Sequence, residues 1–190
     1  LLTAERTALN YLQRLSGIAT QAANYVEAVR GTGVLILDTR KTTPGWRAFE
    51  KYAVQCGGAR NHRRGLDDLI MIKDNHLAAL EALNPVADAV ARAHEAAPDL
   101  KVEVEADTLE QAEAAAAAGA DIILLDNMTP EMLREAVALI DGRSQIEASG
   151  GITFESIRAV AETGVNFISV GALTHSAVAV DIAMDFSPTP

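Results

Sequence analysis

Cysteine is almost absent from this 190-residue chain, and aromatic residues are scarce. The one cysteine, Cys56, excludes an internal disulfide and leaves no Cys/His set for zinc, so a reducing, cytoplasmic compartment is expected. Aromatic residues make up 4% of the chain and hydrophobic residues 49%, so Ala, Val, Ile and Leu must build the core. This composition is typical of helices packed on parallel strands.

Long apolar runs are also missing, and positive charge is scarce in most of the chain. No run approaches the roughly 20 residues that cross a bilayer, and no signal segment opens the sequence, so no membrane partner is expected. The net charge of −10 argues against nucleic acid. Yet seven Lys and Arg lie between Arg40 and Arg64, with Glu50 as the single acid, which indicates a small polyanionic ligand.

Short apolar runs recur along the chain, and helical patterns separate them. Such alternation predicts an α/β fold, either a closed barrel or an open doubly wound sheet. Polar residues follow every run rather than one switch point, which favours an incomplete (β/α) TIM-like barrel of six to seven parallel strands, one domain over residues 1–190. The strands are expected at 34–37, 69–72, 102–104, 122–125, 146–148 and 167–170.

The helices are predicted from periodicity, capping residues and glycine or proline stops. Thr108 with Gln111 forms a capping box, and Thr129 with Pro130 starts the following helix. Near the beginning of the chain, two helices are expected, over 2–14 and 18–29.

Two carboxylates and a group of glycines follow strands at the predicted barrel mouth, the edge where the strands end. Glu105 and Asp126 end near-neighbouring strands, where they can reach a magnesium ion, ribose hydroxyls or a developing cation. Gly150–Gly151 and Gly171 follow the last two strands, where barrels commonly bind phosphate, and His175 can donate to the same phosphate. Taken singly, each residue is more typical of a cap or a turn.

The basic residues near the same edge suit a ligand rich in carboxylates and phosphates, because Arg supplies bidentate geometry and Lys a point charge. They are Arg40, Lys41, Arg60, His62, Arg63 and Lys73. By contrast, Arg47 and Lys51 are expected on the solvent face of their helix.

Nine short motifs are spread over essentially the whole chain. They are residues 5–10 (ERTALN), 16–20 (SGIAT), 38–45 (DTRKTTPG), 57–63 (GGARNHR), 73–76 (KDNH), 102–105 (VEVE), 125–127 (LDN), 147–151 (EASGG) and 171–175 (GALTH). Together and in this order, they resemble quinolinate phosphoribosyltransferase, the family of carboxylating nicotinate-nucleotide pyrophosphorylases.

The resemblance implies an enzyme of NAD biosynthesis that transfers phosphoribosyl from phosphoribosyl pyrophosphate to quinolinate. The products would be nicotinate mononucleotide, carbon dioxide and pyrophosphate, with Mg²⁺ as cofactor. A homodimer or higher homo-oligomer is implied as well.

The resemblance also implies roles for individual residues. Quinolinate would be held by Arg40, His62, Arg63 and Lys73, and by Arg6 from the neighbouring subunit. Phosphoribosyl pyrophosphate would be held by Lys41, Glu105, Asp126, Ser149, Gly150, Gly171 and His175. Glu105 and Asp126 would meet the metal and stabilise the ribose cation, and Lys73 is the candidate proton donor after decarboxylation.

Members of the family carry an α/β sandwich domain before the barrel, and nothing in residues 1–190 corresponds to it. Three hypotheses follow. The chain is the barrel portion of the enzyme, or it belongs to a related phosphoribosyltransferase of unknown acceptor, such as the paralogue among molybdenum-transport genes. The third is a ligand-binding module without turnover.

Overall fold

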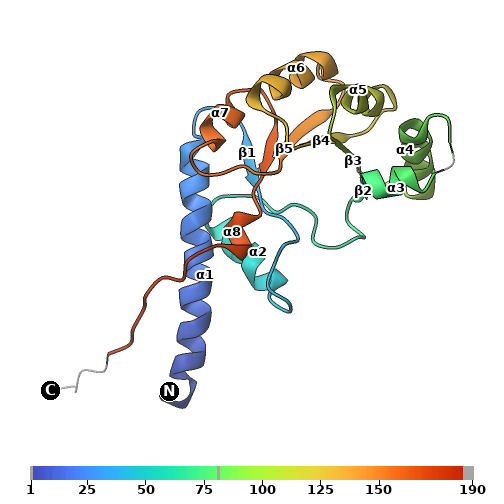
Figure 1. Cartoon of the computed structure of the whole chain (residues 1–190). Helices are drawn as coiled ribbons and strands as arrows, with labels where there is room; N and C mark the ends of the chain where they lie inside the picture. Colours follow the sequence, from blue (N-terminus) through green and yellow to red (C-terminus); the bar gives the residue numbers. More distant parts are fainter. Residues whose placement is uncertain (1, 81, 186–190) are drawn as a thin grey trace.

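The computed structural model describes residues 2–80 and 82–185 (Figure 1). Strands and helices alternate along this part of the chain. In order they are α1 (Leu2–Ala28), β1 (Leu35–Leu37), α2 (Arg47–Cys56), β2 (Ile70–Ile72), α3 (Asp74–Ala78), α4 (Pro85–Ala96), β3 (Val102–Ala106), α5 (Leu109–Ala117), β4 (Ile122–Asp126), α6 (Pro130–Ile140), β5 (Gln145–Ser149), α7 (Ile157–Ala161), β6 (Phe167–Ser169) and α8 (Ala172–His175).

The six strands form one parallel sheet in the order β1-β6-β5-β4-β3-β2. The first strand therefore pairs with the last, as in a barrel, whereas a doubly wound sheet places its first strand inside the sheet. Arg60 extends the β1 edge by a single parallel bridge to Leu37. The sheet is not closed between this bridge and β2, so the predicted incomplete barrel of parallel strands is confirmed.

Alternation along the strands separates a helix-covered face from the barrel interior. In β3, Val102, Val104 and Ala106 are fully buried in the hydrophobic core. Glu103 and Glu105 lie between them and point to the opposite face, because successive side chains of a strand alternate. The core is rich in Ala, Val, Ile and Leu, as the composition predicts.

The first helix differs from the sequence-based expectation of two helices, because α1 runs unbroken from Leu2 to Ala28. Gly17 lies inside it and is buried. A Cβ at this position would come within 2.0 Å of the Val178 carbonyl oxygen, so the glycine serves close packing rather than a helix break. The C-terminal segment runs beside α1 (Figure 1), where the Val180 N–H donates to the Gln13 carbonyl at 3.0 Å.

Other helix signals are confirmed in place. Thr108 accepts from the Gln111 N–H in a capping box, and Thr129 caps α6 with Pro130 in its first turn. Among the described residues, no helix combines the length and apolarity that crossing a membrane demands.

Candidate active site

A cavity of about 310 Å³ lies at the barrel mouth and gathers most of the predicted site residues. Loops and strand ends from the whole sheet contribute to its lining, because parallel strands all end at this edge. Eight of the twelve predicted residues line it: Arg40, Lys41, His62, Arg63, Lys73, Glu105, Asp126 and Ser149.

The two acids of the mouth lie on adjacent strands, β3 and β4, with Glu105 in register with Leu124. Lys73, directly after β2, forms an ion pair with Glu105. Burial, followed by the negative charge of Glu105, raises the pKa of Asp126 above its usual value. A divalent cation between these carboxylates would relieve that repulsion, and carboxylate oxygens are hard ligands of the kind that magnesium prefers.

The cations of the mouth come mainly from irregular segments. The Arg63 guanidinium lies half-buried, where it donates to the Leu69 carbonyl at 3.3 Å. Burial and the neighbouring charge of Arg40 lower the pKa of Arg63. The proximity of these two like charges favours an anionic ligand between them.

The glycines predicted to bind phosphate lie at the rim rather than in the cavity lining. Gly150 and Gly151 have positive φ angles of 84° and 61°, which favour glycine. At Gly171 a Cβ would lie 3.1 Å from the His175 ring and 3.2 Å from the Lys41 side chain. The structure thus brings Gly171, His175 and Lys41 together beside the mouth.

Arg6 lies on the exposed part of α1 and does not line the cavity. Its role in a partner subunit's site stays a prediction.

The expectation for Lys51 was wrong, because this side chain is buried and not on the solvent face. Lys51 Nζ donates to Asp38 Oδ1 at 2.6 Å and to the His62 carbonyl at 3.0 Å. Burial lowers the pKa of Lys51 and raises that of Asp38, while their ion pair opposes both shifts. Arg47 is half-buried and donates to Thr42 Oγ1 at 3.1 Å. The spacing of a surface helix does not reveal that a loop covers one of its faces.

A second buried group involves His62 and two acids that sequence reasoning did not single out. His62 Nε2 lies 3.2 Å from Glu103 and 3.3 Å from Glu147. Burial lowers the pKa of His62, but the two carboxylates outweigh burial and raise it to about 10. Burial likewise raises the pKa of Glu103. The signal that could have revealed them is an acid at an inward position of an otherwise apolar strand.

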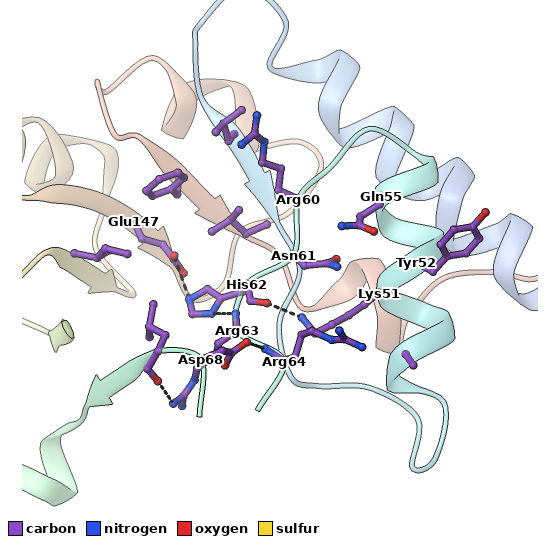
Figure 2. A pocket seen from close by; sticks show the side chains of 16 residues that line it. Lys51, Tyr52, Gln55, Arg60, Asn61, His62, Arg63, Arg64, Asp68 and Glu147 are labelled. Carbon is purple, nitrogen blue, oxygen red and sulfur yellow. Dashed lines mark hydrogen bonds and ion pairs between the residues drawn. The ribbon is translucent and has the colours of Figure 1, made fainter. Parts of the chain in front are cut away.

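A larger cavity of about 740 Å³ opens at the side of the barrel, between the Arg60 bridge and β2 (Figure 2). Leu35, Ile122 and Phe167 give it an apolar wall inside the barrel. His62, Arg63 and Glu147 line both cavities, so they lie between the side opening and the mouth. We place the active site in the smaller cavity, because the paired carboxylates and most predicted cations converge there.

The fold and the site define a parallel α/β barrel domain whose mouth is built for a ligand rich in negative charge. The family model for the quinolinate phosphoribosyl transferase C-terminal domain matches residues 18–185, and the chain belongs to this family.

Named relatives and solved structures agree with this assignment. The chain is 50% identical over 186 residues to the probable carboxylating nicotinate-nucleotide pyrophosphorylase of Bacillus subtilis, and 46% identical over 190 residues to the human carboxylating nicotinate-nucleotide pyrophosphorylase. Each alignment covers 97% of this chain and 63% of the relative. The crystal structure of NadC from Streptococcus pyogenes superposes with a TM-score of 0.92 at 51% identity, covering 98% of this chain and 65% of that one. The chain thus spans somewhat less than two thirds of these relatives.

Proposed function

We propose that this protein transfers a phosphoribosyl group from phosphoribosyl pyrophosphate to the ring nitrogen of quinolinate. The 2-carboxylate would leave as carbon dioxide, and pyrophosphate would be released. The observation that carries the proposal is the convergence of Arg40, Lys41, Arg63 and Lys73 on one cavity with the carboxylates Glu105 and Asp126. The names of the relatives support the same reaction.

The two halves of the mouth suit the two substrates. Arg40, Arg63 and Lys73 offer the charges that two carboxylates of quinolinate require, with a partner's Arg6 as a further candidate. His62, predicted to contact quinolinate as well, lines the same cavity, but both of its ring nitrogens already contact other groups of the protein. Lys41 lies beside Gly171 and His175 and would meet the phosphate groups. Ser149 and Gly150 complete that side. Assembly as a homodimer or higher homo-oligomer belongs to this proposal.

Magnesium fits the paired acids Glu105 and Asp126, whose mutual repulsion a cation would reduce. When bound, the ion would supply positive charge for the pyrophosphate as it departs.

The mechanism that the residues support passes through a cation-like ribose. The bond from C1 of ribose to pyrophosphate breaks as the ring nitrogen of quinolinate bonds to that carbon. Glu105 and Asp126 stabilise the positive charge that develops on the sugar, as carboxylates do in glycoside hydrolysis. The bond to the 2-carboxylate then breaks, and its electron pair stays on the ring carbon beside the positive nitrogen. A proton replaces the lost group, and Lys73 is the proposed donor.

Quinolinate labelled in its 2-carboxylate tests this proposal. With phosphoribosyl pyrophosphate and Mg²⁺ present, the protein should release labelled carbon dioxide, and Asp126→Asn should reduce release at least about 100-fold. Release without phosphoribosyl pyrophosphate, or none with both substrates bound, would contradict it. Pyrophosphate release with a different acceptor would favour the related transferase, whereas substrate binding without any product would favour a binding module.

A further inference from the structure

The interior of the barrel contains two buried acids beneath the proposed catalytic mouth. Glu103 on β3 and Glu147 on β5 flank β4, and their exposed fractions are 0% and 1%. Large aliphatic side chains normally fill this layer of a barrel. Buried carboxylates are costly unless they are paired, so two of them in one layer require an explanation.

Both acids contact the same imidazole. His62 Nε2 lies 3.2 Å from a Glu103 oxygen and 3.3 Å from a Glu147 oxygen (Figure 2 shows Glu147). His62 Nε2 has hydrogen-bond geometry only with Glu103 Oε1, at 3.4 Å. Within residues 2–80 and 82–185, Glu103 Oε2 and both oxygens of Glu147 have no hydrogen-bond partner, so the contact between Glu147 and His62 is an ion pair.

Every other polar atom of His62 is also held. Its N–H donates to Asp38 Oδ1 at 2.8 Å, and its carbonyl accepts from Lys51 Nζ at 3.0 Å. Its Nδ1 lies 2.7 Å from the Arg63 backbone nitrogen. The residue is thus fixed by contacts from the loop after β1, from α2 and from the barrel interior.

This anchoring matters because the segment around His62 has no regular structure. Apart from the Arg60 bridge, residues 58–69 belong to no helix or strand. The next residue, Arg63, carries one of the cations of the mouth. The position of its guanidinium therefore depends on how firmly His62 is held.

We propose that Glu103 and Glu147 are positioning residues, which fix the His62 ring inside the barrel and thereby place Arg63 for the quinolinate carboxylates. The inference rests on the proposed function for its ligand, although the anchoring itself does not. A positioning role predicts a local effect: quinolinate binding should weaken, whereas phosphoribosyl pyrophosphate binding at the opposite side of the mouth should not.

The test compares Glu103→Gln, Glu147→Gln and the double variant with Glu113→Gln, an exposed acid paired with Arg143 on the outer surface. Gln keeps the shape of Glu and removes its charge. In the double variant, amide hydrogen exchange at 60–63 should accelerate at least about tenfold while exchange in β4 stays unchanged. Calorimetry should show quinolinate affinity about tenfold weaker or more, with phosphoribosyl pyrophosphate affinity within about twofold.

The outcomes separate this inference from the proposed function. If the unaltered chain binds no quinolinate, the proposed ligand is wrong, and faster exchange confined to 60–63 still establishes the anchoring. Unchanged exchange at 60–63 in the double variant would overturn the inference, as would equal loss of both affinities. Stabilisation of the unaltered chain by stoichiometric Zn²⁺, absent in Glu147→Gln, would also overturn it, since the cluster would then be a metal site.

Discussion

Lys51 and Asp38 form an ion pair to which water has almost no access, with side-chain exposures of 2% and 0%. Removing one partner of such a pair leaves the other charge buried without compensation. Lys51→Met should therefore lower the free energy of unfolding by about 3 to 5 kcal/mol, measured by urea denaturation.

Lys101→Met is the matched control, because Lys101 is exposed and its change should stay within about 0.5 kcal/mol. Asp38→Asn combined with Lys51→Met should recover part of the lost stability, since no unpaired charge remains. A Lys51→Met variant as stable as Lys101→Met would show that the pair is not buried in solution.

The cluster of His62, Glu103 and Glu147 makes stability depend on pH. The pKa of His62 is raised from 6.5 to about 10, and that of Glu103 is raised as well, so the folded cluster binds more protons than the unfolded chain. The contribution of His62 is complete below pH 6.5 and is lost as pH rises through about 10. The difference in unfolding free energy between the unaltered chain and His62→Gln should shrink over this interval. A difference that grows with pH would contradict the account.

At the residue scale, the sequence allowed the polar positions of the mouth to be predicted but not the buried polar contacts. Glu105 and Asp126 lie at the carboxyl ends of β3 and β4, and this position identified them. Lys51, by contrast, has the spacing of a surface residue, and only the fold shows that the 60–63 segment covers it. The role of Glu147 could not be predicted from the sequence for a similar reason, because its partner His62 lies 85 positions earlier in the chain.

At the scale of elements, α1 provides a test in which two physical effects have opposite signs. Helix propensity alone predicts that Gly17→Ala stabilises the helix by about 1 kcal/mol. The Val178 carbonyl lies 2.0 Å from the new Cβ, so we expect destabilisation by about 1 to 3 kcal/mol instead. The unfolding temperature of Gly17→Ala distinguishes the two effects, because propensity would raise it and the clash would lower it.

Ala23→Gly at an exposed position of the same helix is the control, expected to cost about 0.5 to 1 kcal/mol by propensity alone. A stabilised Gly17→Ala variant would mean that the C-terminal segment does not pack on α1.

All six strands lie where the apolar runs predicted them, within about one or two residues at each end. Buried parallel strands are nearly continuous in Val, Ile and Leu, which makes them easy to recognise. The break expected near Gly17 was wrong because glycine also serves close packing, and that packing involves residues some 160 positions later.

At the scale of the whole molecule, the parallel sheet brings Glu105 and Asp126 from adjacent strands into one cavity, where we propose that they share a cation. Millimolar Mg²⁺ should raise the unfolding temperature of the unaltered chain, because a ligand that binds only the folded state stabilises it. The double variant Glu105→Gln with Asp126→Asn should lose this response. An equal rise in the unfolding temperature of the unaltered chain and of the double variant would show that Mg²⁺ binds at another site.

We propose that the mouth recognises a pyridine with two adjacent carboxylates. Calorimetric titration of the chain with quinolinate and with nicotinate, which lacks the 2-carboxylate, tests this recognition. We predict that quinolinate binds at least about tenfold more tightly, and that Arg63→Ala and Lys73→Ala abolish this preference while the unfolding temperature changes little. Arg64→Ala is the matched control, because Arg64 neighbours Arg63 but does not line the mouth, and it should retain the preference. Equal affinity for the two ligands, or a preference that survives Arg63→Ala, would contradict the account.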